Sequence, residues 1–485
     1  MIPILKQQAG LYTDFYELTM AQGYFLTGRH EQSACFDYFF RKSPFKGGYV
    51  VFAGLNDLLE ILGDLTFESE DIRYLKDLGF HKDFLSTLER FRFRGSLYSV
   101  KEGEIIFPNE PVLRVEGNIL ETQIIETLVL NILNFESLIA TKASRLKRSA
   151  GKRSVIEFGL RRAQGLGGIH ASRAAIIGGA DATSNVYSAH AFGLKPSGTM
   201  AHSWVESFGD ELEAFRMFSN IYPDTSIFLV DTYDTLNSGI PNAIKVAQEM
   251  QKEGHQLIGI RLDSGDLAYL SKRARVLLDD EGLPYVKIVA SNQLDEHIIK
   301  SLLEQGSPID VFGVGTSLVV GRDDAALDGV YKLSMYQNEP RLKISENAEK
   351  ILLPGVKKIF RYFTGENKFY ADAVVREKED EIDQMFHPYQ PVKHLELRHL
   401  RKEPLLYCVM TKGEVVISKL NPYEIAGYVH DRLSYLPEEH KRFENPHVYK
   451  VGISLELMNL RNELINSKFP KGVLGAQFKF KIDPT

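Results

Sequence analysis

Residues 257–267 read LIGIRLDSGDL, and this stretch decides the fold that the sequence predicts. Its apolar half has the composition of a buried strand, and its polar half, DSGD, turns at Ser264 and Gly265. A helical pattern of apolar residues follows from Leu267. A strand that ends in a polar turn and leads into a helix is the repeating unit of sheets with parallel strands.

The same unit recurs on both sides of this stretch, between residues 154 and 336. We find it in SVIEFGLRRAQG, SNVYSAHAFG, GTMAHSW, SIFLVDTYDT, YVKIVASNQLD, DVFGVGTSL and VYKLSMY. Because so many strands alternate with helices, the sequence predicts an α/β fold built on an irregular (β/α) barrel rather than an open sheet. The carboxyl ends of barrel strands carry the chemistry, and the polar tails of these segments fall there.

The chain changes character before and after this region. Residues 1–150 mix helical patterns with antiparallel strands, and residues 346–485 are rich in hairpins. We therefore expect an N-terminal domain over 1–150, a catalytic barrel over 151–345, and a C-terminal segment over 346–485 that packs on both.

Composition restricts the kinds of partner. The 485 residues are 44% hydrophobic and carry a net charge of −6, which argues against a nucleic-acid or membrane surface but allows a local basic pocket for a small phosphorylated ligand. Cys35 and Cys408 are isolated, which excludes a disulfide scaffold and a zinc ribbon. The sequence shows no signal-peptide pattern and no apolar run of about 18 residues. We expect a cytoplasmic protein with neither a nucleic-acid nor a membrane partner.

The segment FGVGTSL, residues 312–318, places Gly313, Gly315 and Thr316 at the end of an apolar strand. Small residues let backbone N–H groups approach an anion and the hydroxyl adds a donor, so phosphate is the natural ligand. The alternative is a tight strand-to-helix turn without a ligand. The sequence contains no GxxxxGK[ST] motif, so ATP, if it is used, is not bound by a P-loop.

Two further strand ends carry charge: Arg261, Asp263 and Asp266 follow IGI, and Asp231 and Asp234 lie in LVDTYDT. An arginine fork suits a carboxylate or phosphate, and carboxylates suit ribose hydroxyls or Mg²⁺. The alternatives are an internal Arg–Asp pair and aspartates that cap the following helices. We favour a functional role for the first segment and leave the second open.

Two other segments combine aromatic and basic residues. In EFGLRRAQG, Phe158 ends a strand before Arg161, a pattern that suits a flat heterocycle and an anion, although a strand phenylalanine is more often core. In RKSPFKGG, Arg41 and Lys42 begin a loop that is either a phosphate clamp or a solvated hairpin end.

The segment PSGTMAHSW, residues 196–204, brings a hydroxyl and an imidazole together after a turn. Thr199 and His202 are three positions apart, and we expect Trp204 only to pack.

Eight segments in series resemble nicotinate phosphoribosyltransferase over nearly the whole chain, most weakly after about residue 370. They are LYTDFYELTMAQGYF, FDYFFRKSPFKGGYVVFAGL, EFGLRRAQG, GTMAHSWV, LVDTYDT, IRLDSGDL, SNQLDE and FGVGTSL.

The resemblance implies an irregular α/β barrel of the type II phosphoribosyltransferase kind, packed with an α/β sandwich domain, in a homodimer with active sites at the interface. It implies that nicotinate and 5-phosphoribosyl 1-pyrophosphate give nicotinate mononucleotide and pyrophosphate. ATP hydrolysis would be coupled to this reaction and Mg²⁺ would be the cofactor, in the first step of NAD salvage from nicotinate.

The resemblance also implies roles for single residues. Tyr16, from the neighbouring subunit, and Phe158 would hold the pyridine ring between them. Thr199 and Arg261 would hold nicotinate, and His202 would be phosphorylated by ATP. Asp263 would hold ribose hydroxyls. The candidate Mg²⁺ ligands, Asp231 and Asp263, follow instead from the chemistry of carboxylates. The remaining candidates are Gly313, Gly315 and Thr316 for the 5′-phosphate, Arg161, Arg41 and Lys42 for phosphate groups, and Asp181 for a ring contact.

Three alternatives remain. Nicotinamide or quinolinate could replace nicotinate as the base. The chain could bind a nucleotide without catalysis, although His202, Arg261, Asp263 and Thr316 are all present. An aldolase-like sugar-phosphate enzyme would need a Schiff-base lysine or a zinc cluster at a strand end, and the sequence shows neither.

Overall fold

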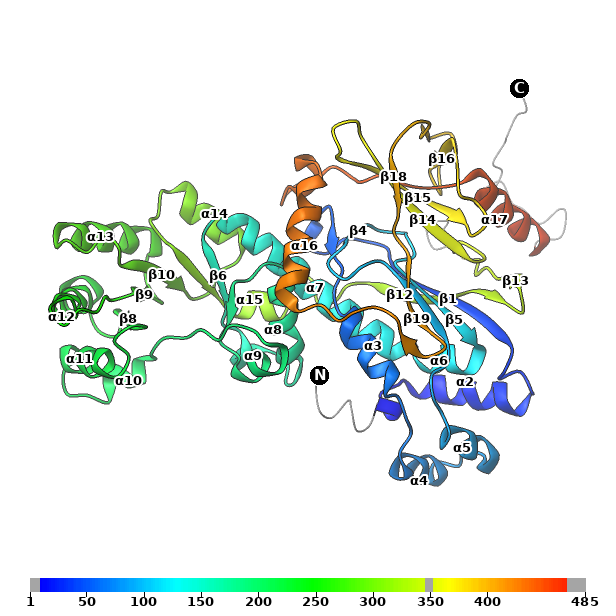
Figure 1. The fold of residues 1–485 in the computed structure, drawn as a ribbon, viewed down its shortest axis with the longest axis horizontal. Helices are drawn as coiled ribbons and strands as arrows, with labels where there is room; N and C mark the ends of the chain where they lie inside the picture. Colours follow the sequence, from blue (N-terminus) through cyan, green and yellow to red (C-terminus); the bar gives the residue numbers. More distant parts are fainter. Residues whose placement is uncertain (1–8, 345–351, 469–485) are drawn as a thin grey trace. The chain divides into compact units, whose positions relative to one another are not determined.

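The computed structural model describes residues 9–344 and 352–468, which fold into two compact units. Of the described residues, the first unit takes 9–134, 327–344, 352–419 and 431–468, and the second takes 135–326 and 420–430. Figure 1 shows the course of the chain through both. The division into 1–150, 151–345 and 346–485 stays a prediction.

The second unit is built on a six-stranded sheet in the order β7-β6-β11-β10-β9-β8. Every neighbouring pair in it is parallel, as the alternation of strands and helices predicts. Helices α11, α12 and α13 lie along the outer side of β8, β9 and β10 in Figure 1. The strands are β6 (Ser154–Glu157), β7 (Ala182–Thr183), β8 (Ile227–Leu229), β9 (Gly259–Leu262), β10 (Lys287–Ser291) and β11 (Val311–Val314).

Five of the helices and helical turns of this unit, α9, α11, η4, α13 and α14, begin at a side-chain cap that the sequence supplies. Asp266 accepts from the N–H of Tyr269 at 3.0 Å, and Asp295 caps α14 in the same way. The helices and helical turns are η3 (Leu160–Arg162), α8 (Gly167–Ile177), α9 (Val186–Phe192), α10 (His202–Glu206), α11 (Glu211–Ile221), η4 (Thr235–Gly239), α12 (Ile240–Lys252), α13 (Leu267–Asp280), α14 (Glu296–Glu304) and α15 (Thr316–Val319).

Three of the predicted strand units are wrong in detail. SNVYSAHAFG holds α9, because the side chain of Asn185 caps a helix there. GTMAHSW runs without regular structure into α10. VYKLSMY is β12 (Gly329–Tyr336) of the first unit, where it pairs antiparallel with β1 (Ser33–Phe40). An apolar run that continues a series of parallel strands does not reveal that its partner lies almost 300 residues earlier in the chain.

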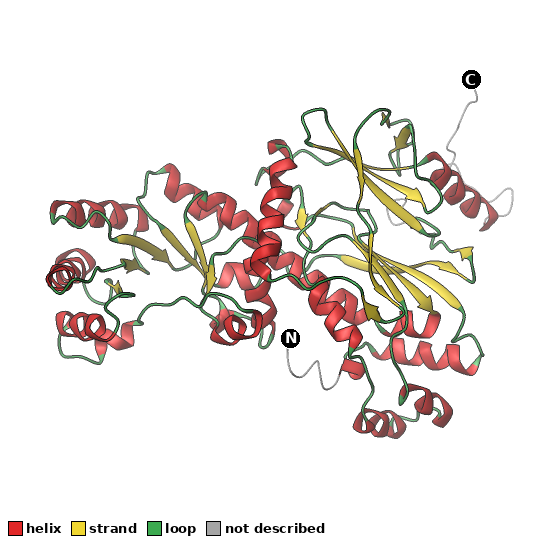
Figure 2. Cartoon of the chain, viewed as in Figure 1, coloured by secondary structure: helices red, strands yellow, loops and turns green. Residues whose placement is uncertain are grey.

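The first unit contains two larger sheets, visible as yellow arrows in Figure 2. One has the order β13-β12-β1-β5-β3-β19-β20, and its neighbouring strands are antiparallel. The other has the order β17-β16-β21-β15-β14-β18, in which β15 and β21 are parallel. The remaining strands are β2 (Val50–Val51), β3 (Ser96–Ser99), β4 (Ile105–Ile106), β5 (Leu113–Asn118), β13 (Glu339–Pro340), β14 (Lys357–Phe363), β15 (Phe369–Arg376), β16 (Gln384–Phe386), β17 (His394–Glu396), β18 (Lys402–Pro404), β19 (Tyr407–Thr411), β20 (Glu414–Val415) and β21 (Val451–Ile453).

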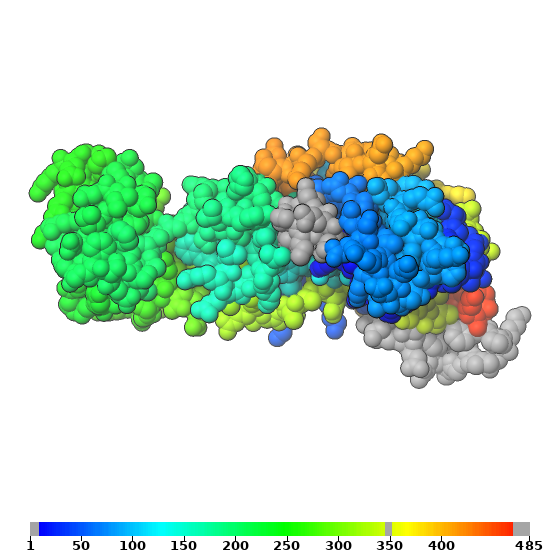
Figure 3. Space-filling model, turned by 90° about the horizontal axis from the view of Figure 1, so that it is seen from below, coloured from blue at the N-terminus to red at the C-terminus, as the bar shows by residue number. Residues whose placement is uncertain are grey.

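The first α-helix of the first unit is α2 (Phe15–Leu26). Figure 3 shows orange atoms against the blue N-terminal part of the unit. Lys419, which follows β20 in the sequence, pairs with Glu60 at 2.8 Å. The other helices are η1 (Ala9–Leu11), η2 (Pro44–Lys46), α3 (Leu55–Gly63), α4 (Ser69–Asp77), α5 (Lys82–Leu88), α6 (Ile119–Ile124), η6 (Glu438–Lys441) and α17 (Leu455–Lys468), while α7 (Glu126–Ala150) and α16 (Pro422–Tyr435) have residues in both units.

A buried ion-pair network ties distant segments of the first unit together. The guanidinium of Arg361, which is fully buried, contacts Asp372 at 2.5 Å and Glu104 at 2.7 Å. Arg432 reaches the same Glu104 at 2.8 Å. Because removal of one partner would leave a buried charge uncompensated, these residues fix how β4, β14 and β15 meet.

Within the described ranges, no helix combines the length and the apolar content needed to cross a membrane.

Candidate active site

The carboxyl ends of the parallel strands bring the predicted site residues together in the second unit. Arg261 pairs with Leu229 of β8 and with Val289 of β10, and Asp263 follows β9 immediately. Ser291 pairs with Gly313 of β11. Since neighbouring parallel strands end at the same edge, these side chains form one row across the sheet.

Arg261 is the centre of this row. Its Nε donates to Ser291 Oγ at 2.9 Å, its Nη1 to Thr199 Oγ1 at 2.8 Å, and its Nη2 to Asp263 Oδ1 at 3.0 Å. The structure thus joins Thr199 and Arg261, as the resemblance implies, although they are far apart in sequence. The internal Arg–Asp pair that the sequence left as an alternative is also present, and it is part of the same arrangement.

Phe158 follows β6 and presents its ring to this group. The Arg261 guanidinium carbon lies 5.7 Å from the ring centroid, within the range of a cation–π contact. A methyl group on Gly313 would lie 2.5 Å from two ring carbons of Phe158, so only glycine leaves room for the ring. Phe158 is half-buried, which leaves part of the aromatic surface available to a ligand.

His202 is the first residue of α10 and is half-buried. Its Nδ1 lies 3.1 Å from the hydroxyl of Thr232, the residue after Asp231. The hydroxyl holds the ring while the second nitrogen, Nε2, stays available for chemistry. Trp204 packs as predicted, because its indole N–H donates to Ala214 O at 3.1 Å and its ring contacts Phe208.

Asp231 offers one free carboxylate oxygen. Its Oδ2 accepts from the N–H of Asp263 at 2.8 Å and from Ser264 Oγ at 2.6 Å. Its Oδ1 is buried and has no hydrogen-bond partner among the described residues. A buried carboxylate oxygen without a donor fits a bound cation, and oxygen ligands are those that Mg²⁺ prefers.

The second aspartate of each charged segment has a structural role. Asp234 accepts from the N–H groups of Leu236 and Asn237, and these hydrogen bonds, the Asn237 side chain first, lower its carboxyl pKa. Asp266 caps α13. For these two residues the helix-cap alternative is therefore correct.

Gly315 and Thr316 form the turn from β11 into α15. Thr316 is exposed, and its hydroxyl has no hydrogen-bond partner within the described part of the chain. The turn η3, which carries Arg161, packs against α15. The exposed residues Thr316 and Arg161 therefore lie on adjoining elements beside the glycine turn, an arrangement that suits a phosphate.

The structure does not bring Asp181 to this row. Its carboxylate pairs with Lys147 Nζ at 2.8 Å and accepts from the N–H of Val155 at 2.8 Å, near the amino end of β6. This is the opposite end of the strands from Phe158 and Gly313. The position of Asp181 argues for a structural role.

Tyr16 belongs to the first unit, on the exposed side of α2. Burial and the neighbouring Glu126 and Glu17 raise the pKa of its hydroxyl, so the side chain is neutral near pH 7. Glu17 itself is buried and accepts from the N–H of Thr127 at 3.0 Å, and burial raises its carboxyl pKa to about 7.

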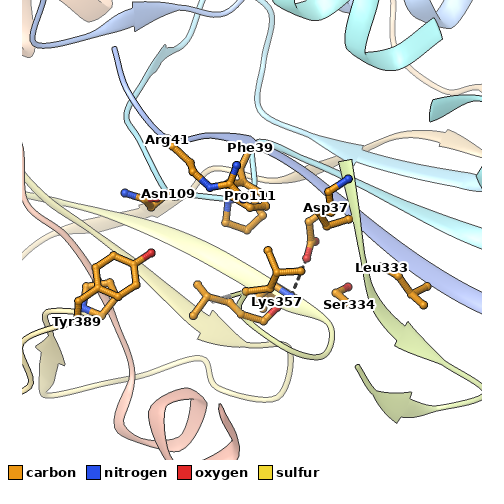
Figure 4. Close-up of a pocket in the computed structure, with 13 residues that line it drawn as sticks. Asp37, Phe39, Arg41, Asn109, Pro111, Leu333, Ser334, Lys357 and Tyr389 are labelled. Atoms are coloured by element: carbon orange, nitrogen blue, oxygen red, sulfur yellow. Dashed lines mark hydrogen bonds and ion pairs between the residues drawn. The ribbon is translucent and has the colours of Figure 1, made fainter. Parts of the chain in front are cut away.

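Arg41 also belongs to the first unit, just after β1, and lines a small pocket of about 30 Å³ (Figure 4). Asp37 and Lys357, joined at 2.7 Å, lie at one end of this pocket and Tyr389 at the other. Lys332 lines it too, so its basic side chains outnumber the acidic one.

Lys42 lines a neighbouring cavity of about 640 Å³. The described residues that line it include three lysines and three histidines but no carboxylate: Lys42, Lys393, Lys450, His387, His394 and His447. Such a cavity favours an anion.

Sequence reasoning missed Ser291, Glu157 and Thr232. Ser291 and Thr232 stand in segments that the sequence did mark, SNQLD and DTYDT, but a single hydroxyl after a strand carries no signal of its own. Glu157 is fully buried, and its carboxylate accepts from the N–H of Gly159 and from Ser172 Oγ at 2.9 Å. It fixes the turn that carries Phe158.

A parallel α/β sheet that ends in an arginine–aspartate pair and a glycine–threonine turn fits the phosphoribosyltransferase class. Three family models then cover most of the chain: the nicotinate phosphoribosyltransferase N-terminal domain over residues 11–134, the nicotinate phosphoribosyltransferase family over 154–350, and the nicotinate phosphoribosyltransferase C-terminal domain over 356–461. The chain belongs to the nicotinate phosphoribosyltransferase family.

Individual relatives agree with this assignment. The chain is 44% identical over 455 residues to the nicotinate phosphoribosyltransferase of Bacillus subtilis, covering 92% of each protein. It is 37% identical to that of Dictyostelium discoideum, over 94% of this chain and 88% of the relative. The crystal structure of human nicotinic acid phosphoribosyltransferase matches with a TM-score of 0.83 at 29% identity, over 93% of this chain and 99% of that one.

Proposed function

We propose that the protein is a nicotinate phosphoribosyltransferase that works in NAD salvage from nicotinate. It joins nicotinate to 5-phosphoribosyl 1-pyrophosphate, forming nicotinate mononucleotide and pyrophosphate, and ATP hydrolysis is coupled to this step. The observation that carries the proposal is the fixed guanidinium of Arg261 beside the ring of Phe158. A cation and an aromatic surface side by side suit a pyridine carboxylate.

The transfer needs positioning more than proton chemistry. The pyridine nitrogen forms a bond to C1 of the ribose while the C1–O bond to pyrophosphate breaks, and the electron pair leaves with the pyrophosphate oxygen. The nitrogen carries no proton, so no general base is needed. Arg261 and Thr199 hold the carboxylate and thereby aim the ring nitrogen at C1. Phe158 supports one face of the ring, and Tyr16 of a neighbouring subunit supports the other.

The phosphate groups of the donor meet the glycine turn and the basic side chains. Gly313, Gly315 and Thr316 hold the 5′-phosphate at the start of α15. Arg161 lies on η3 beside them. Arg41 and Lys42 reach phosphate groups from a second copy of the chain, a role that fits the basic linings of their two pockets.

Asp231 and Asp263 are the residues that would hold Mg²⁺. The free, buried Oδ1 of Asp231 supports this role, and Asp263 has one oxygen, Oδ2, that does not contact Arg261. Bound Mg²⁺ would neutralise charge on the departing diphosphate. Asp263 also accepts from ribose hydroxyls.

His202 accepts the phosphoryl group of ATP. The hydroxyl of Thr232 fixes Nδ1, which directs Nε2 toward the phosphorus atom. The N–P bond forms as the bond to ADP breaks, and later hydrolysis releases phosphate. The phosphoryl group on His202 is dianionic and lies beside the diphosphate site, so it alters how 5-phosphoribosyl 1-pyrophosphate binds. This change in binding couples ATP hydrolysis to the transfer.

The strand order supports an irregular barrel of the type II phosphoribosyltransferase kind in the second unit. A parallel bridge between Thr183 and Pro196 extends the sheet beyond β7 toward Thr199. Because Thr199 contacts Arg261 on β9, the chain returns toward the opposite side of the sheet. The first unit would form the α/β sandwich domain. The exposed aromatic side chains of Phe15 and Tyr16 support a homodimer with shared active sites. The proposed location of this homodimer is the cytoplasm.

The decisive experiment measures pyrophosphate release with nicotinate, nicotinamide and quinolinate in turn. We expect activity with nicotinate, stimulated by ATP. Activity with nicotinamide and none with nicotinate would overturn the substrate assignment. Tight nucleotide binding without release of pyrophosphate from any base would favour a non-catalytic relative.

A further inference from the structure

Ser291 is a buried residue at the centre of the row of strand ends. It is the last residue of β10 and is 3% exposed. On one side lies β9, which carries Arg261 and is followed by Asp263, and on the other lies β11, which carries Gly313. The next two residues, Asn292 and Gln293, have left-handed φ values of 84° and 48°. Because such backbone is unfavourable for residues other than glycine, the fold keeps a sharp turn directly after Ser291.

The hydroxyl of Ser291 closes a ring of three hydrogen bonds. Its single hydrogen goes to Asp263 Oδ1, and its oxygen accepts from Arg261 Nε at 2.9 Å. Arg261 Nη2 donates to the same Asp263 oxygen at 3.0 Å. Ser291 therefore contacts both ligand-binding side chains at once and has no hydrogen left to offer a ligand.

The three hydrogen bonds of this ring leave some N–H donors of the Arg261 guanidinium free. A guanidinium has five N–H donors, and the bonds to Ser291, Thr199 and Asp263 use three of them. Nε has only one hydrogen, so the two that remain belong to Nη1 and Nη2. The carbonyl of Met200 is 3.5 Å from Nη1, at the outer limit of a hydrogen bond. Two N–H groups on the terminal nitrogens match one carboxylate.

We propose that Ser291 is a positioning residue that fixes how Arg261 receives the carboxylate of the base. By occupying Nε it keeps the guanidinium from turning, so Nη1 and Nη2 face the substrate. By donating to Oδ1 of Asp263 it leaves Oδ2 as the oxygen that faces the ribose. The inference rests on the proposed function, because it assigns the carboxylate of nicotinate to Arg261.

The test compares Ser291→Ala, which removes the hydroxyl, with Ser291→Thr, which keeps it. The control is Ser271→Ala, because Ser271 is also fully buried in the second unit but bonds only to the backbone of α13. We expect Ser291→Ala to raise the KM for nicotinate at least tenfold and to change kcat less than threefold, since the carboxylate is held equally in the ground and transition states. Ser291→Thr should keep KM within threefold of the parent, and Ser271→Ala within twofold.

The outcomes separate this inference from the proposed function. If the parent protein releases no pyrophosphate with nicotinate, the proposed function fails and the inference with it. If the parent is active and folded Ser291→Ala keeps its KM for nicotinate within twofold, the inference alone fails. It also fails if Ser291→Ala and Ser291→Thr lose activity and Tm to the same extent, because the hydroxyl would then serve packing only.

Discussion

At the end of the parallel sheet, the ring of Phe158 occupies the position that a side chain on residue 313 would take, and residue 313 is glycine. We predict that Gly313→Ala displaces the ring and lowers kcat/KM for nicotinate about 100-fold, the size of effect that a misplacement of about 1 Å has on a reaction controlled by positioning. Steady-state kinetics of pyrophosphate release provide the measurement. Gly209→Ala is the control, because nothing lies within 4 Å of the added carbon there, and equal loss in both variants would contradict the explanation.

Arg261 should not tolerate lysine. A lysine has the same charge but cannot reach Ser291, Thr199 and Asp263 together and still offer two donors to a carboxylate. Charge-assisted hydrogen bonds of about 1.5–3 kcal/mol imply a loss of about 10- to 150-fold in kcat/KM for Arg261→Lys. Arg216→Lys is the matched control, since Arg216 forms a two-pronged pair with Glu249 at the surface. An unchanged KM for nicotinate in Arg261→Lys would contradict the role of Arg261.

His202→Ala should separate ATP hydrolysis from phosphoribosyl transfer. We expect ATP hydrolysis and its stimulation of the transfer to disappear while a slower, ATP-independent release of pyrophosphate remains. Phosphate release from ATP is the measurement, and an acid-labile phosphoryl group should appear on the parent protein but not on His202→Ala. The exposed His190 on α9 provides the control variant His190→Ala. Undiminished ATP hydrolysis by His202→Ala would rule out phosphorylation at His202.

Asp231→Asn tests the cation site. Asparagine keeps one oxygen but removes the charge, so we expect the Mg²⁺ concentration for half-maximal activity to rise about tenfold. A Mg²⁺ titration at saturating substrates measures this. Asp234→Asn is the control, because Asp234 caps η4. If both variants respond to Mg²⁺ like the parent, Asp231 is not a ligand.

Glu17 should make the stability of the protein depend on pH. Burial raises its carboxyl pKa to about 7 in the fold, so between its unfolded value and pH 7 the folded state binds more protons than the unfolded state. Stability therefore falls as the pH rises through this window. Glu17→Gln mimics the protonated form, and its Tm should match that of the parent near pH 5 and exceed it by a few degrees at pH 8. Thermal unfolding across this range, with the exposed Glu70→Gln as control, checks the prediction; parallel Tm profiles would refute it.

The sequence predicted the parallel sheet because apolar runs ending in polar turns are a strong local pattern. The same pattern pointed to Arg261 and Gly313, which lie near the ends of β9 and β11, and to Asp263 and Asp231, which come one and two residues after β9 and β8. Asp181 was misjudged because β7 has only two residues, too few to show which end of the strand an adjoining aspartate occupies.

Ser291 shows why part of the site could not be predicted. Its function depends on the distances to Arg261 and Asp263, which arise only when β9 and β10 pair in register. The partner of β12 was also hidden, because pairing with β1 joins residues that are almost 300 positions apart in the sequence. The barrel closure and the shared active site remain proposals.

The pairing of β1 with β12 also has a consequence for the nascent chain, because β12 is synthesised long after β1. On a ribosome that adds about 5–20 residues per second, the strand at Ser33–Phe40 waits roughly 15–60 s before Gly329–Tyr336 is made. One edge of β1 is covered early by β5, but the other stays open throughout this interval. A polypeptide cut short in this interval would expose an unpaired apolar edge, and truncated products should be prone to aggregation and early degradation.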